Sequence, residues 1–208
     1  MGSGRLSPSP EGIQAVADAV LRGEVSTKTI NRWTELFWER GGFFHTVDVR
    51  AFQKQELEGA LVRRYAGTKD VAHRVTFGAK GRAGCVVVRA PRERDSYQGD
   101  LNDLLVPPHT HPTAHIAIVF GGGGTFVAKR AIDEVNHIVM IPASPGSIFF
   151  YPAHIPHTFV SGKQGIQVAS AQAEFESPKS AEFARLSTQD LNALPRMEQA
   201  EYESSLEL

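Results

Sequence analysis

Four histidines lie at spacings that can build a metal site on β-strands. His109, His111 and His115 fall in PPHTHPTAHIAIVF, and His157 follows in PGSIFFYPAHIPHTF. Residues two apart on a strand point to the same face, so His109 and His111 can share one face and His115 keeps that parity. A partner strand can deliver His157. Because neutral imidazole suits zinc, iron, copper and nickel better than calcium or magnesium, the cluster predicts one bound divalent metal ion per chain.

The same residues resemble the two sequence motifs of the cupin family. The first motif reads HxH, three residues, Glu, six residues and Gly, and its positions hold His109, His111, His115 and Gly122. The second reads Gly, five residues, Pro-x-Gly, two residues, His, three residues and Asn, and its positions hold Gly146, Pro152, His154, His157 and Ser161. The match covers His109 to Ser161, roughly a quarter of the chain.

Three positions depart from the cupin pattern. His115 stands in place of the carboxylate, which resembles the four-histidine variant, and His154 stands in place of a turn glycine. Asp103 occupies the place where a glycine usually precedes the first histidine pair. The resemblance implies a mainly β fold, a single cupin-type antiparallel β-barrel (double-stranded β-helix) with an N-terminal helical segment, that assembles as a homodimer.

The metal chemistry stays open between several classes. All-histidine cupins include dioxygenases, so the resemblance favours a non-heme Fe(II) dioxygenase that uses O2 on a small metal-chelating organic substrate. Zn(II), Ni(II) or Mn(II) would instead act as a Lewis acid in a lyase, isomerase or cyclase. A site with every position closed would be structural only. Since four neutral imidazoles leave the metal its full positive charge, an anionic substrate is expected.

The acid–base and substrate-binding residues are predicted only from their positions in the sequence. We expect His154 to lie at the barrel mouth and act as the acid–base residue, with Tyr151 and Glu174 as alternative bases. Arg89, Tyr151 and Gln167 are predicted to bind substrate, Arg89 by clamping a carboxylate. Ala117 and Val119 share the inward parity of the histidines and predict an apolar pocket floor. The polar connection around Tyr97 has the length of a lid or binding loop.

Hydrophobic periodicity divides the chain into four parts: a disordered leader at 1–9, a helical segment at 10–66, the barrel at 67–176 and an acidic, solvated tail with short helices at 177–208. Ser9 and Ser26 are predicted N-caps for helices starting at Pro10 and spanning Thr27 to Arg40. A third helix is expected after Asp48, burying Phe52, Leu57 and Leu61. Short β-rich runs follow from Ala72, and Gly121–Gly124 predicts a turn between two of them.

Composition excludes several classes of protein. The chain has 208 residues, a net charge of -1 and a single cysteine. Balanced charge argues against a broad nucleic-acid or anionic-membrane surface, and no apolar run approaches the ~18 residues of a membrane span. Cys85 in GCVVVRA is expected to be a small buried side chain, and one cysteine suits a reducing cytoplasm.

The N-terminal helices raise the alternative of a regulator. AVADAVLRGEVSTKTINRW resembles a helix-turn-helix, although Glu24 adds one residue to the usual turn. Residues 1–66 hold nine Lys/Arg and eight Asp/Glu, and 9 minus 8 leaves only +1 for phosphate contacts. We therefore expect these helices to cover the barrel, while a helix-turn-helix plus cupin ligand-sensing transcriptional regulator and a ligand-binding storage protein or sensor remain the competing hypotheses.

Overall fold

The computed structural model describes residues 9–20, 25–50, 101, 108–162, 165–171 and 189–206, and the backbone of 21–22, 62–64, 72–77, 84–89, 163–164, 172, 184–185 and 188. The elements in chain order are α1 Pro10–Arg22, α2 Thr27–Trp38, β1 Phe43–His45, β2 Val62–Arg64, β3 Ala72–Phe77, β4 Gly84–Arg89, β5 His109–Thr110, β6 His115–Ile132, β7 Val135–Ala143, β8 Ser147–Tyr151, β9 His157–Gln172, β10 Ala184–Arg185, α4 Thr188–Asn192, β11 Arg196–Glu198 and α5 Gln199–Leu206.

The first two helices begin where their capping residues predict. The Ser9 hydroxyl accepts a hydrogen bond from the Gly12 backbone N–H, and the Ser26 hydroxyl accepts one from the Thr29 N–H, each over 3.2 Å. After α2 the chain turns through Gly41 and Gly42, both with positive φ, as the paired glycines predicted. Of the third helix expected after Asp48, Arg50 is helical, and Phe52, Leu57 and Leu61 lie outside the described residues.

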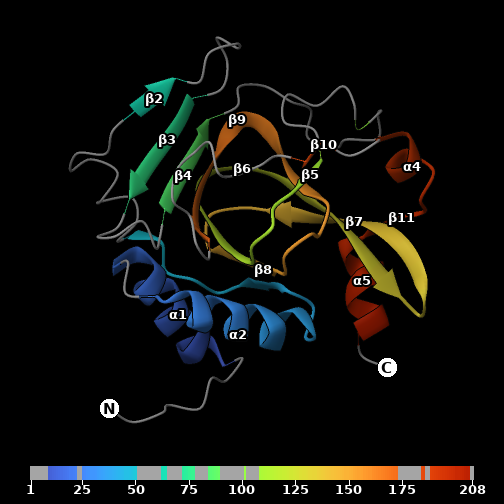
Figure 1. The fold of residues 1–208 in the computed structure, drawn as a ribbon, viewed down its shortest axis with the longest axis horizontal. Coiled ribbons are helices and arrows are strands. Elements are labelled where there is room, and N and C mark those ends of the chain that lie inside the picture. Colours follow the sequence, from blue (N-terminus) through green and yellow to red (C-terminus); the bar gives the residue numbers. More distant parts are fainter. Residues whose placement is uncertain are drawn as a thin grey trace.

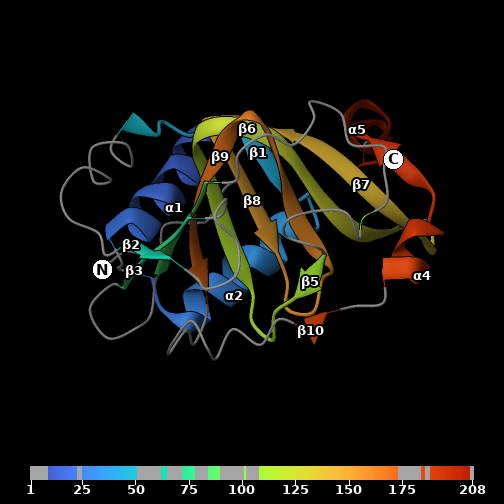
Figure 2. The same cartoon turned by 90° about the horizontal axis from the view of Figure 1, so that it is seen from above.

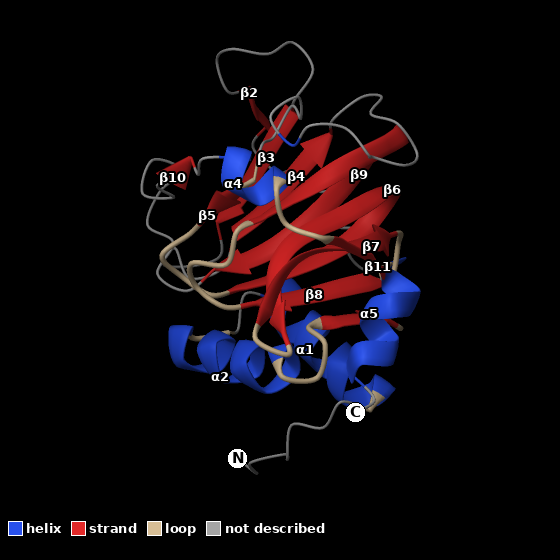
Figure 3. Cartoon of the chain, turned by 90° about the vertical axis from the view of Figure 1, so that its right-hand side faces the viewer, coloured by secondary structure: helices blue, strands red, loops and turns tan. Residues whose placement is uncertain are grey.

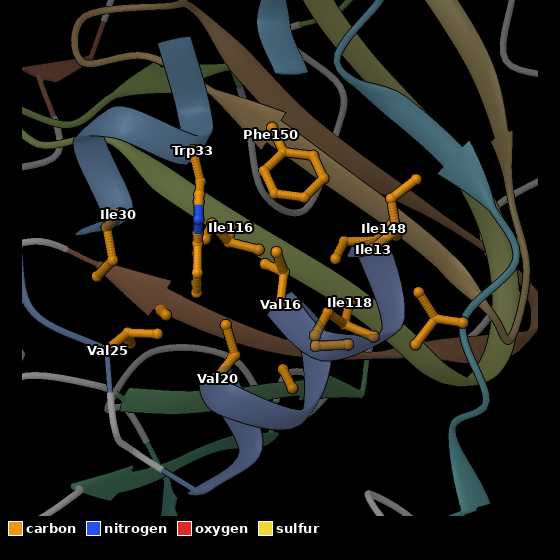
Figure 4. Close-up of a cluster of buried hydrophobic side chains, with 14 of the residues drawn as sticks. Ile13, Val16, Val20, Val25, Ile30, Trp33, Ile116, Ile118, Ile148 and Phe150 are labelled. Carbon is orange, nitrogen blue, oxygen red and sulfur yellow. The ribbon is translucent and has the colours of Figure 1, made fainter. Parts of the chain in front are cut away.

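The two helices form a layer on one side of the curled sheet (Figures 1 and 3). Apolar residues of α1 and α2 meet the outward-facing residues of β6 and β8 in one buried cluster, which Figure 4 shows with Ile13, Val16, Ile30, Trp33, Ile116, Ile118, Ile148 and Phe150. Burial of these apolar side chains stabilises the two helices, which are too short to be stable in isolation. The expectation of a helical cover is therefore confirmed.

The segment expected to be helical throughout 10–66 also contains strands, which corrects that prediction. Phe43–His45 forms β1 and pairs antiparallel with β8, and Val62–Arg64 forms β2 and pairs with β3. The cause at β1 is packing: the Phe44 ring lies 5.4 Å from that of Phe37 and 6.1 Å from that of Phe150, while Phe43 stacks on Phe149. Phe43 and Phe44 thus contact opposite faces of β8, because successive side chains of an extended chain point to opposite sides.

A long antiparallel ribbon of β6 and β9 forms the centre of the fold. The ladder starts at His115 opposite Gln172 and runs to Ala128 opposite His157, and β6 pairs with β7 and β8 as well. The sheet order is β1-β8-β6-β9-β5-β10, with β7 between β6 and β11. β4 lies beside β9, next to β3 and β2 (Figure 1). The mainly β, curled, cupin-type architecture predicted from the motifs is confirmed.

The glycines at 121–124 bend this ribbon and do not end a strand, so the predicted turn is wrong. β6 continues through them, and its pairing with β9 shifts register between Val119 and Gly121 and between Gly122 and Gly124. Gly122 has a φ of 67°, and a Cβ there would lie closer than 3.0 Å to the Gly165 carbonyl oxygen. Glycine is needed because the two backbones approach too closely for a side chain.

The acidic C-terminal segment is packed against the sheet, contrary to the predicted solvated tail. β11 pairs in parallel with β7, and α4, α5 and β7 lie together at one side of the molecule (Figure 2). Met197 and Tyr202 are 6% and 2% exposed, and the Tyr202 hydroxyl donates to the Gly41 carbonyl over 2.7 Å. The expected helix at TQDLNAL is α4, whereas Ala184–Arg185 of SAEFARLS is strand β10. The acidic residues around Met197 and Tyr202 led the sequence analysis to miss that these two side chains are buried.

A buried arginine joins this C-terminal segment to the helical layer. Arg130 on β6 donates to the Trp38 carbonyl, and its guanidinium lies 4.1 Å from the Trp38 ring centroid and 5.3 Å from that of Tyr202. Burial lowers the pKa of Arg130, while the neighbouring Tyr202 opposes that shift. The cation–π contacts compensate part of the cost of desolvating the charge. No described helix is both long enough and apolar enough to cross a membrane.

The glycine bend generates the first prediction. Gly122→Ala should lower the free energy of unfolding by about 3 kcal/mol, because the new Cβ meets backbone that side-chain rotation cannot move. Gly123→Ala is the matched control: its Cβ would lie 3.2 Å from the Ala143 carbonyl oxygen, and it should cost at most about 1 kcal/mol. Urea unfolding measures both, and equal midpoints in the two variants would show that the bend does not require a glycine at 122.

Candidate metal centre

Three of the four predicted ligands come together at one end of the curled ribbon. His109 on β5 is the direct Cα partner of His157, the first residue of β9, and His111 follows β5 by one residue. One ring nitrogen from each of these three residues lies within 4.8 Å of the others. This is the only such group of three among the described residues.

His115 lies next to the three-histidine group at the start of β6. Its ring centroid is 4.3 Å from that of His111 and 5.9 Å from that of His157. The rings of His109 and His111 are 4.9 Å apart, and those of His109 and His157 are 4.7 Å apart. The four imidazoles therefore form one cluster, in which His115 lies farther from His157 than His109 does. Its role as a fourth ligand stays a prediction.

Backbone carbonyls orient two of the imidazoles. Nδ1 of His115 lies 3.0 Å from the Thr113 carbonyl, and Nδ1 of His157 lies 2.8 Å from the Ile155 carbonyl. Since a carbonyl only accepts, Nδ1 carries the proton and Nε2 carries the lone pair. Nε2 of His115 is buried with no hydrogen-bond partner among the described residues. A buried lone pair of this kind fits a metal ion, which supplies the missing partner.

Half-buried His137 on β7 makes the same contact with the Val135 carbonyl, over 3.0 Å. The local hydrogen bond is therefore a property of the strand geometry and does not by itself identify a ligand. What separates His115 and His157 from His137 is burial beside other imidazoles.

Burial keeps these histidines neutral. It lowers the pKa of His111 to about 3, with the neighbouring His109 adding to the shift. Burial also lowers the pKa of His115 and His157 well below the usual value of histidine, and the other histidines add to it. Neutral imidazole is the form that binds a metal, so no proton has to leave these rings at neutral pH.

An aromatic side chain and an apolar floor border the histidines. Tyr151, the last residue of β8, stacks on His115 with centroids 5.0 Å apart and an angle of 7°, and lies 4.2 Å from His157. Ala117 and Val119 are buried in the same interior cluster as Tyr151, Phe126 and Phe149, as their inward parity predicted. Burial raises the pKa of Tyr151, so its hydroxyl stays protonated. The cluster excludes water from the floor of the site.

His154 lies outside this interior. It is exposed in the turn between Pro152 and His157 with a φ of 64°, the left-handed conformation that glycine adopts most readily. Its backbone N–H donates to the His111 carbonyl over 2.8 Å, which ties the two motif loops together. No ring contact joins His154 to the histidine cluster within the described part of the chain. An acid–base role at the mouth stays a prediction.

Of the remaining substrate-binding candidates, the structure describes the side chain of Gln167 but not that of Arg89. Gln167 pairs with Gly121 at the bend of the ribbon, and a Cβ at 121 would meet its side-chain amide. Arg89 ends β4 with its backbone opposite Ala72, and its side chain is outside the description, as are the side chain of Cys85 and residues Tyr97 and Glu174. Their predicted roles stay untested.

Two supporting residues near the histidines escaped sequence analysis. Thr34 of α2 is 1% exposed, and its hydroxyl donates to the His115 carbonyl over 3.4 Å. The Thr113 carbonyl orients the ring of the same histidine. The Thr34 contact has no sequence signal, because it depends on how α2 packs beside the start of β6, whereas the Thr113 contact is the same local one that His137 and His157 make.

Comparison with known proteins adds a family match. No curated protein matches the chain. Among solved structures, a tryptophan-to-tyrosine variant of oxalate decarboxylase from Bacillus subtilis has a TM-score of 0.43 and 15% identity over 61% of this chain and 30% of that chain. The Bacillus subtilis enzyme at pH 4.6 has a TM-score of 0.44 and 14% identity over 60% and 29%. The present chain thus spans about 30% of these longer chains.

The family model of the AraC-like ligand binding domain matches residues 96–203, which are 108 of the 208 residues. The matched region contains the four clustered histidines, the whole β6–β9 ribbon and Tyr202. The chain therefore belongs to the family of AraC-like ligand-binding domains, which confirms the resemblance to cupins.

Proposed function

We propose that this protein is a metal-dependent cupin enzyme, and that it is a non-heme Fe(II) dioxygenase for a small organic substrate that chelates as an anion. The observation that carries the metal proposal is the convergence of ring nitrogens of His109, His111 and His157 within 4.8 Å, where burial lowers the pKa of His111 and His157. His115 is proposed as the fourth ligand, since its Nε2 is buried and oriented by the Thr113 carbonyl.

The proposed division of roles follows from the residues. The four imidazoles would hold the metal, and bound Fe(II) would supply the one-electron chemistry that lets O2 react with an organic substrate. Burial lowers the pKa values of His111, His115 and His157, and neutral imidazoles would leave the metal its full positive charge, so an anionic substrate would provide the compensating negative charge. Tyr151 would position the substrate through its protonated hydroxyl, and the apolar cluster around Phe126 would exclude water.

The runner-up within the enzyme class is a lyase, isomerase or cyclase that uses Zn(II), Ni(II) or Mn(II) at the same histidines. The family match favours a second class, a ligand-sensing regulator, because the matched domain type is a ligand-binding domain. Against DNA recognition by α2, Ile30, Trp33 and Phe37 of this helix are buried against the sheet, which leaves Lys28 and Arg32 as its exposed basic residues. Assembly as a homodimer stays a prediction from the cupin resemblance.

Removing one ligand tests the metal site. The wild-type protein should bind one equivalent of divalent metal, and His111→Ala or His157→Ala should abolish stoichiometric binding, because each supplies one of the three converging nitrogens. His115→Ala should weaken binding by about 10- to 100-fold if this residue is the fourth ligand. Elemental analysis and competition with a chelator measure both.

The control for this experiment is His137→Ala, since His137 makes the same ring–carbonyl contact but does not belong to the group of converging histidines. A full equivalent of metal in both His111→Ala and His157→Ala would show that the ligands are assigned incorrectly.

Proton linkage gives a second test. His111 has a pKa of about 3 in the folded chain and near 6.5 when unfolded, so below 6.5 the unfolded chain binds the extra proton. In the metal-free protein, the contribution of such a histidine to the free energy of unfolding should therefore be fully present above pH 6.5. Below pH 6.5 the free energy of unfolding should fall by about 1.4 kcal/mol per pH unit for each such histidine. Urea unfolding at pH 7.5, 6.5 and 5.5 measures the slope. The slope should be shallower in His111→Gln, and equal slopes in wild type and His111→Gln would refute the linkage.

Oxygen dependence separates the candidate reactions. After anaerobic reconstitution with Fe(II), Zn(II), Ni(II) or Mn(II), the protein should convert an enolisable or aromatic acid only with Fe(II) and O2. Turnover that is equally fast without O2, or fastest with Zn(II), would eliminate the oxygenase and favour the non-oxidative enzyme. Retarded, salt-dependent binding of duplex DNA without any turnover would favour the regulator.

A further inference from the structure

We infer that this chain carries a second small-molecule site, on the outer side of the barrel, for a small organic ammonium ligand. A pocket of about 340 Å³ lies between α2 and the loops that precede β6 and follow β8. Its volume is within the range of ligand pockets. Thr27, Asn31 and Glu35 line it from successive turns of one side of α2, and Pro112, Thr113 and Pro152 line it from the loops.

This pocket and the histidine cluster lie on opposite faces of one backbone segment. Ala114, which lines the pocket, belongs with Ile116 to the buried cluster that faces α1 and α2. The intervening His115 points the other way, toward Tyr151 in the barrel interior. A molecule in the pocket is therefore separated from the proposed metal centre by a single strand and is not a substrate of that centre.

The lining selects the chemistry of the ligand. Among the described lining residues Glu35 is the only ionisable one, and no described salt bridge engages it. Thr27, Asn31 and Thr113 offer hydroxyl and amide groups, so the polar side suits an ammonium and a hydroxyl group. Pro112 and Pro152 present C–H surfaces, which suit the faces of a small saturated ring.

Two contacts lead from the pocket to the histidines. The hydroxyl of Thr34, a lining residue, donates to the His115 carbonyl, and the carbonyl of Thr113, another lining residue, accepts from the His115 ring. A ligand that shifts either threonine changes the orientation of the His115 imidazole. Occupancy would thus alter metal affinity, and metal would alter occupancy by the same factor. Only this last step rests on the proposed metal function.

Three ring compounds of similar size and different charge test the site: 4-hydroxypiperidine as the cation, cyclohexane-1,4-diol as the neutral compound and 4-hydroxycyclohexanecarboxylate as the anion. They are titrated into the metal-free protein and followed by NMR. The cation should bind about tenfold or more tightly than the other two, shifting the Thr113 and Ala114 amides and the His115 ring resonances. Glu35→Gln should weaken binding of the cation by about tenfold.

The matched control is Glu39→Gln, because Glu39 is the exposed C-cap residue of α2, four residues after Glu35, and does not line the pocket. It should bind the cation as the wild type does. Equal binding of the three compounds, unchanged binding in Glu35→Gln, or binding that leaves the His115 resonances unmoved would each overturn the inference.

A second measurement keeps this inference separate from the proposed function. Saturating 4-hydroxypiperidine should change Zn(II) affinity by about fivefold or more in the wild type, and Glu35→Gln should need about tenfold more of the compound for the same change. If the wild type binds no metal at all, the proposed function fails, while the NMR titration of the metal-free protein still decides the pocket. Unchanged Zn(II) affinity at saturation would refute the coupling.

Discussion

The close approach of the β6 and β9 backbones at their glycines is the constraint on which the rest of the structure depends. A straight ribbon of this length would place its two ends far apart, because each strand residue advances by about 3.3 Å. Register shifts at Gly121–Gly124 bend the ribbon, so His115 at one end of the β6–β9 ladder lies near His157 at the other. β5 then pairs His109 with His157. The histidine cluster, its apolar floor and the outer surface that the helices cover all follow from this bend.

Electrostatics at the cluster follow from the same geometry. The bend buries several imidazoles together and away from solvent, so each one lowers the pKa of the next and all favour the neutral form. Carbonyls two residues earlier fix the proton on Nδ1 of His115 and His157. The chain thus holds lone pairs in a dry environment before any metal is bound, which reduces the reorganisation that binding requires.

Local signals predicted much of this from sequence. The two capping serines, the helix-stopping glycines and the alternation of Ala117 and Val119 with the histidines are short-range patterns, and each is confirmed. The errors came from long-range packing. Gly121–Gly124 has turn composition but meets another backbone, β1 is extended because its phenylalanines pack on β8, and the acidic C-terminal segment is held by Tyr202 and Arg130. The pocket beside α2 and the contact of Thr34 with His115 could not be predicted from the sequence, because both depend on how distant segments pack together.

Continuity of β6 and β9 has a consequence for kinetics. The outer ends of the same two strands carry the clustered imidazoles, while the bend between them is held by backbone contacts. Peeling either strand from the sheet would therefore disrupt the cluster and the ladder in one event. Local opening would then release an ion held by the cluster, so such an ion could stay bound no longer than the ribbon stays closed, and its residence time would set a lower limit on the lifetime of the closed ribbon.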